Sequence, residues 1–159
     1  MFFLNCYYNS SNTTELFIKL NNNKKTDFSR YNYFQASYAA SQGKIDEAKN
    51  IVQSTLKLYP RNLLLNQYKI NLDKNKNLSN FNCSQESHII AEILYITANA
   101  LSSQSIYPLS NFYLNLAKYL NEDFHSYDTL LAENFYKTDN LENAKKIYNN
   151  LSKKGEAYK

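Results

Sequence analysis

The chain alternates between segments in which apolar residues recur at helical spacing and short polar breaks. Residues 13–20 and 63–72 each carry an apolar face at this spacing, and residues 21–23 and 73–84 are polar. Apolar residues three and four positions apart lie on one side of a helix. We therefore expect an all-α protein of about eight helices, in which Ser84 or Ser87 caps the long helix that follows the second polar break.

Residues 29–62 form a unit that is marked by small residues, a glycine and a proline at particular positions. Ala36, Gly43, Ala48 and Pro60 occupy positions 8, 15, 20 and 32 of a unit that is 34 residues long. Small residues at positions 8 and 20 let two helices approach closely, glycine ends the first helix, and proline follows the end of the second. The pattern predicts a helical hairpin.

The same unit fits twice more, at residues 91–124 and 125–158. Ala98 and Ser110 take the two small positions in the first of these copies. Ala132 and Ala144 stand 34 residues further on and take them in the second. Self-similarity at this period is the signature of a repeat architecture.

These residues resemble the tetratricopeptide repeat, which implies a right-handed α-α superhelix of hairpins. Asn32 and Asp128 at position 4, and Gln35 and Thr97 at position 7, depart from that family's pattern. Residues 29–159 also resemble part of a longer, uncharacterised repeat protein of alphaproteobacteria. The resemblance implies an N-terminal helix and polar loop at 1–28, and a repeat domain at 29–159 with an extra helix and loop at 63–90.

Composition supports a helical class and argues against nucleic-acid binding. Apolar residues make up 43% of the chain and charged residues 20%, and only two glycines and two prolines are present. An all-β fold would need more turn residues. The net charge of +4 comes with isolated lysine pairs such as Lys153-Lys154, whereas nucleic-acid readers carry a denser basic patch. No apolar run is long enough for a membrane-spanning helix.

The residues that could support chemistry do not assemble into a motif. Cys83 and His88 lack the further pair of ligands that a zinc site needs. Cys6 or Cys83 paired with His125 would lack an orienting group and an oxyanion hole. Two glycines cannot build a phosphate loop. We expect no catalytic, metal or cofactor site, and two free cysteines.

The start of the chain does not resemble an export signal. No lysine or arginine precedes Lys19, and the first apolar run stops at Asn5. This pattern predicts a cytoplasmic protein by default. If the chain is a fragment of a longer precursor, a periplasmic or envelope location is expected instead.

The family resemblance places partner binding in a groove lined by the first helix of each repeat. The side chains carried over to this groove are Arg30, Tyr33, Ser37, Glu92, Tyr95, Asn99, Ser103, Thr129, Glu133, Tyr136 and Lys137. We expect a non-catalytic scaffold or adaptor that binds a peptide or helix of a protein partner. One alternative is a structural segment that self-associates through end repeats without a polar cap. Another is the accessory half of an enzyme.

Overall fold

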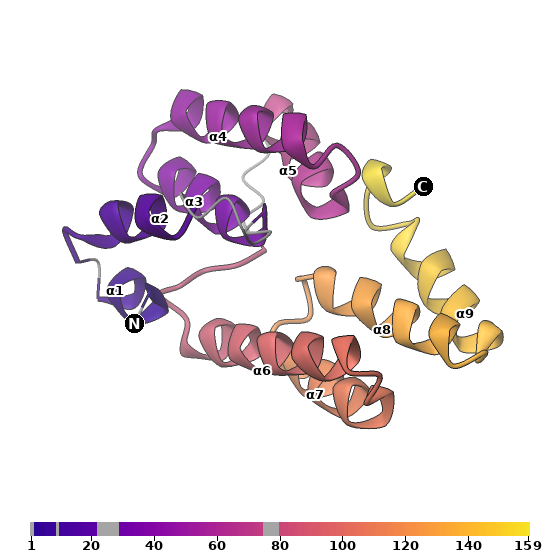
Figure 1. Cartoon of the computed structure of the whole chain (residues 1–159). Coiled ribbons are helices and arrows are strands. Elements are labelled where there is room, and N and C mark those ends of the chain that lie inside the picture. The colour runs from indigo at the N-terminus through magenta and orange to yellow at the C-terminus, as the bar shows by residue number, and fades with distance from the viewer. Residues whose placement is uncertain (1, 9, 22–28, 75–79) are drawn as a thin grey trace. The chain divides into compact units, whose positions relative to one another are not determined.

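The computed structural model describes residues 2–8, 10–21, 29–74 and 80–159, and these residues are all-helical with no strand (Figure 1). Nine α-helices and one short 3-10 helix are present in this part of the chain. They are α1 (Phe2–Tyr7), α2 (Thr13–Asn21), α3 (Ser29–Ser41), α4 (Ile45–Leu58), α5 (Leu63–Asp73), α6 (Glu86–Ser103), α7 (Tyr107–Leu120), α8 (Ser126–Lys137), α9 (Leu141–Leu151) and η1 (Glu156–Tyr158).

The helices predicted at 13–20 and 63–72 are confirmed as α2 and α5, and each predicted repeat contains a helical hairpin. The predicted serine cap is wrong. Gln85 precedes α6 at the N-cap position and makes no side-chain cap hydrogen bond. Of the polar break at 73–84, residues 75–79 lie outside the described residues.

The three hairpins, α3–α4, α6–α7 and α8–α9, turn with nearly the same backbone geometry. Position 15 has a positive φ in each: 78° at Gly43, 63° at Ser105 and 59° at Asp139. The next residue then donates its N–H to a carbonyl of the preceding helix, in the pairs Lys44–Ala39 (3.0 Å), Ile106–Leu101 (2.9 Å) and Asn140–Phe135 (2.9 Å). This left-handed residue ends a helix by satisfying its last carbonyl groups.

Small residues occupy the helix–helix contacts of the hairpins, as predicted. The side chains at positions 8 and 20 are buried in all three: Ala36 and Ala48, Ala98 and Ser110, and Ala132 and Ala144. Ser110 satisfies its buried hydroxyl by donating to the carbonyl of Ala98 at 2.8 Å. Small side chains at these points allow the two helices of a hairpin to approach closely.

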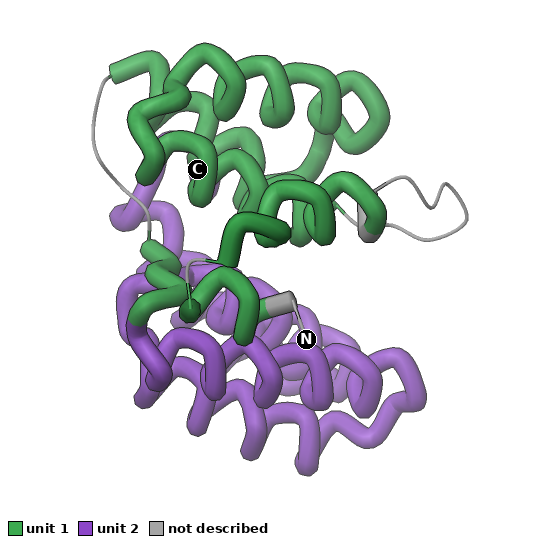
Figure 2. Tube along the Cα trace, turned by 90° about the vertical axis from the view of Figure 1, so that its left-hand side faces the viewer, with its two compact units in different colours: residues 1–84 green, residues 85–159 purple. Residues whose placement is uncertain are grey.

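The chain divides into two compact units, residues 1–84 (unit 1) and residues 85–159 (unit 2), coloured separately in Figure 2. The boundary falls inside the predicted insertion at 63–90. Unit 1 contains α1 to α5, and unit 2 contains α6 to α9. In unit 2, α7 packs against both α6 and α8, so the two hairpins form one stack.

Unit 1 is closed by a disulfide that the sequence analysis did not predict. Cys6 of α1 and Cys83 are bonded, with 5.8 Å between their Cα atoms, so the expectation of free cysteines is wrong. The two cysteines are 77 residues apart in sequence. The bond joins the first helix of unit 1 to the segment that ends it.

Aromatic rings from distant segments meet beside this disulfide. Phe34 of α3 lies 5.5 Å from the ring of Phe3 and 4.5 Å from that of Phe81, between ring centroids. Phe17 of α2 lies 6.1 Å from Tyr38 of α3. Such pairs stabilise a core beyond the area that they bury. The helix α3, which is the first of the α3–α4 hairpin, is therefore covered by α1, α2 and the segment around Phe81.

Candidate functional site

The predicted groove residues of unit 1 belong largely to its core. Tyr33 and Ser37 are buried, and the ring of Tyr33 packs edge-to-face on Tyr68 of α5 at 5.0 Å. Burial raises the pKa of Tyr68 to about 12, against the opposing effect of a hydrogen bond with Ser37. Arg30 is half-buried, with its guanidinium 5.6 Å from the Phe34 ring centroid. This set of side chains packs unit 1 and does not form an open contact surface.

The groove residues of unit 2 divide into packed and exposed side chains. Glu92 is buried, and half-buried Tyr95 packs on Tyr127 at 5.6 Å, so Tyr95 joins α6 to α8. Thr129 is half-buried and donates to the Ser126 carbonyl at 2.7 Å. The side chains that remain exposed are Asn99 and Ser103 on α6, and Glu133, Tyr136 and Lys137 on α8.

These five exposed side chains form the candidate binding surface of unit 2. They stand at positions 9 and 13 of α6 and at positions 9, 12 and 13 of α8, two helices that contact each other. The surface offers an amide, a hydroxyl, a phenol and one charge of each sign. It therefore suits a partner with both polar and apolar groups. Sequence reasoning named all five, but it could not separate them from the six that pack.

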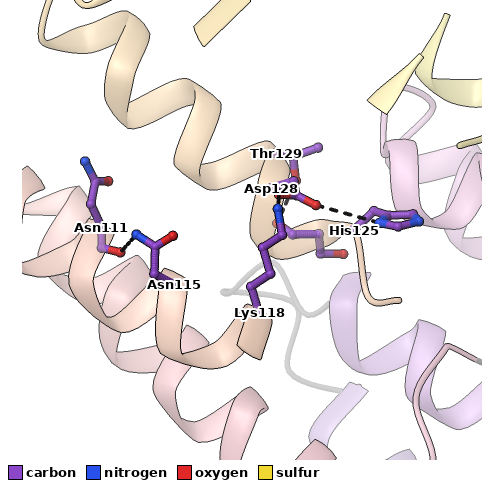
Figure 3. A network of polar contacts seen from close by, with 7 residues as sticks. Asn111, Asn115, Lys118, His125, Asp128 and Thr129 are labelled. Atoms are coloured by element: carbon purple, nitrogen blue, oxygen red, sulfur yellow. Dashed lines mark hydrogen bonds and ion pairs between the residues drawn. The ribbon is translucent and has the colours of Figure 1, made fainter. Parts of the chain in front are cut away.

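A second polar cluster, which sequence reasoning missed, joins α7 to α8 (Figure 3). The ammonium of Lys118 donates to Oδ1 of buried Asp128 at 2.5 Å, and Nδ1 of His125 lies 3.7 Å from its Oδ2. Burial alone would raise the pKa of Asp128. The hydrogen bonds and charges of His125 and Lys118 outweigh it, so this pKa lies below its ordinary value. Asp128 is thus held ionised as a packing ion pair and is poorly suited to donate a proton.

The cluster borders a cavity of about 570 Å³ with mixed charges. Lys153 and Lys154 line it together with Glu122 and Asp123. An anion and a cation would each meet like charges here. The cavity therefore shows no preference for ligands of one sign.

The aromatic rings of unit 1 line a further cavity, of about 320 Å³. Its walls include Phe3, Phe17 and Phe34, with the disulfide at one side. Among the described residues, no acidic, basic or histidine side chain lines it. Its chemistry is limited to apolar contact and weak hydrogen bonds from residues such as Ser37 and Asn82.

A buried amide supports the stacking of the two hairpins in unit 2. Asn134 of α8 accepts from the hydroxyl of Ser102 at 2.6 Å, and it donates to Ser110 and Asn111 at 2.8 Å each. These partners lie on α6 and α7, so one side chain connects three helices. A fully satisfied buried network favours a single register between packed elements.

The cysteine and histidine pairs considered from the sequence have no free thiol. Cys6 and Cys83 are bonded to each other, so neither can act as a nucleophile beside His125, nor can Cys83 bind a metal with His88. Among the described residues, no three His, Cys, Asp or Glu side chains lie together as a metal site would require. Within the same residues, no helix has the length and apolar character needed to cross a bilayer.

No family model matches the chain, and no curated protein is significantly similar to it.

Proposed function

We propose that the protein is a non-catalytic interaction module built from tetratricopeptide-like hairpins, and that the candidate binding surface of unit 2 holds a peptide or helix of a protein partner. The repeated turn at Gly43, Ser105 and Asp139 supports the repeat interpretation. The observation that carries the function is the row of exposed side chains at equivalent positions of α6 and α8.

The surface would act by presenting groups that are already in position. α6 and α8 are held together by the Tyr95–Tyr127 contact and by the Asn134 network, so a partner would order few groups on binding. Tyr136 supplies an amphipathic ring of the kind found at binding hot spots. Glu133 and Lys137 would select a partner segment with charges of both signs.

The test is partner capture from a lysate of the source cell, with the captured protein then titrated in purified form. The variant Asn99→Ala/Glu133→Ala/Lys137→Ala removes three surface side chains. Tyr95 is left intact because it packs α6 on α8. The matched control Asn50→Ala/Glu142→Ala/Lys57→Ala removes exposed residues of the same types on α4 and α9.

We expect the native chain and the control to retain one partner, and the surface variant to bind it at least about tenfold more weakly with unchanged helicity. Equal binding by all three proteins would overturn the proposal.

A self-associating structural role is a second candidate. It is favoured by a specific observation in unit 2, which is that apolar side chains on both outer faces of its two-hairpin stack are exposed.

A further inference from the structure

Equivalent positions of the three hairpins reveal which faces are covered. We define the downstream face of a hairpin by positions 12, 21 and 24, which point toward the next helix along the chain. The upstream face is defined by positions 3, 6 and 10, which point toward the preceding one. Positions 3, 6 and 10 share a side of the first helix, and positions 21 and 24 share a side of the second, because they are three or four residues apart. Position 12 lies in the last turn of the first helix.

The downstream face is covered in the first two hairpins and open in the third. At position 24, Val52 and Leu114 are both 0% exposed, beneath α5 and α8 respectively, whereas Tyr148 is 41% exposed. At position 12, Ser102 is buried and bonded to Asn134 of α8, whereas Tyr136 is 66% exposed. Tyr148 therefore lies where both other hairpins bury their side chain, and Tyr136 lies where the second hairpin does, whereas Ala40 at position 12 of the first hairpin is half-buried.

The upstream face is covered in the first and third hairpins, and it is open in the second, on α6. At position 6, Phe34 and Leu130 are 2% and 7% exposed, and Ile96 is 42% exposed. At position 3, Tyr127 is 1% exposed and Ile93 is 54% exposed. Phe3 and Phe81 cover the upstream face of α3.

The two open faces of unit 2 are the two halves of a contact that the unit already makes once. Within it, the downstream face of α6–α7 receives the upstream face of α8. The exposed downstream face of α8–α9 has no upstream face packed on it. The exposed upstream face of α6 has no downstream face packed on it. Burial of apolar side chains is the main driving force for closing such a contact.

We propose that a second copy of this chain places the upstream face of its α6, with Ile93, Ile96 and Ala100, on the downstream face formed by Tyr136, Lys145 and Tyr148. This inference rests on the self-associating candidate function. Ala100 stands at position 10, where α8 has Asn134, so its small side chain leaves room for the stem of Lys145. The lysine stem can cover apolar surface while its charge stays in water.

The contact joins two different faces, so assembly is head-to-tail. Each added copy still presents one open face of each kind. Such heterologous contacts form rings when the rotation closes and open filaments when it does not. Association therefore continues beyond a dimer.

The test measures the mass of the 159-residue chain by sedimentation velocity across a dilution series. Ile93→Glu/Ile96→Glu blocks the upstream face, and Lys145→Glu/Tyr148→Glu blocks the downstream face. All four side chains are exposed, so both variants should fold. We expect the native mass to rise with concentration and each variant to associate at least about tenfold more weakly.

Mixing the two variants distinguishes a head-to-tail contact from a symmetric one. Each variant keeps one intact face, so an equimolar mixture should form a 1:1 dimer that grows no further. Phe112→Glu alters an exposed ring of α7 outside both faces and should associate like the native chain.

The inference would be overturned if the native chain stays monomeric at the highest concentration. This includes the case in which unit 1 of the same chain covers α6. The inference would also be wrong if the native chain associates but the equimolar mixture of the two variants forms no 1:1 dimer. The surface variant Asn99→Ala/Glu133→Ala/Lys137→Ala should still assemble, so failure of partner binding and failure of assembly are separate results.

Discussion

At the scale of single residues, the charged group with the clearest structural role is Asp128. It is buried between Lys118 and His125, and its pKa lies below the ordinary value of 3.8. The unfolded chain therefore takes up a proton at a higher pH than the folded protein does. The stabilising contribution of Asp128 is complete above its ordinary value and is lost as the pH falls through the lowered, folded-state value.

We predict that Asp128→Asn makes the stability of unit 2 less sensitive to acid. Urea unfolding between about pH 6 and pH 2 would show a smaller fall in the free energy of unfolding than in the native chain. Lys118→Met should reduce the fall in the same direction, because it removes the ammonium that donates to Oδ1 of Asp128. The same acid dependence in all three proteins would show that the ion pair does not lower this pKa.

At the scale of elements, the hairpin turn requires the same backbone conformation of three different residues. Position 15 needs a positive φ, which glycine adopts without strain and other residues adopt at a cost of about 1–2 kcal/mol. Gly43 adopts this positive φ at no steric cost. Ser105 and Asp139 adopt it although each has a side chain. A Cβ added at Gly43 would meet no atom within 4 Å, so only the backbone term opposes it.

We therefore predict opposite effects at equivalent positions. Gly43→Ala should lower the free energy of unfolding by about 1 kcal/mol, and Ser105→Gly should raise it by up to about 1 kcal/mol. Chemical denaturation of the two variants beside the native chain measures both changes. A destabilising Ser105→Gly would mean that the serine side chain contributes more than its backbone strain costs.

At the scale of the whole molecule, the two units differ in how they are held together. Unit 1 is closed by a disulfide across 77 residues, and its hairpin is covered on both faces. Unit 2 contains no cysteine and relies on packing, the Asn134 network and the Lys118–Asp128 pair. A covalent link over so long a loop restricts the unfolded chain strongly.

We predict that reduction, or Cys6→Ser/Cys83→Ser, destabilises unit 1 by about 2–5 kcal/mol and leaves unit 2 nearly unchanged. Hydrogen exchange followed by mass spectrometry reads the two units separately. Protection should fall in α1 to α5 and persist in α6 to α9. An equal loss of protection in both units would show that they unfold together.

The local features of the fold could be predicted from the sequence because they depend on nearby residues. Helical spacing predicted α2 and α5, and the small residues at positions 8 and 20 are buried as expected. The binding surface was predicted less well. Tyr33, Ser37 and Glu92 stand at the same kind of position as Asn99 and Glu133 but are buried. Position within a repeat does not show which neighbouring elements cover it.

The sequence by itself determined the all-α class, the hairpins and the small residues at their contacts, because turn chemistry and periodicity act over a few residues. Only the tertiary structure decided that Cys6 meets Cys83 and that Asn134 joins three helices. It likewise decided that Ile93 and Tyr148 are exposed, while Tyr127 and Leu114 at the same repeat positions are buried. These outcomes depend on which distant segments come together, and burial is a property of those neighbours rather than of the residue itself.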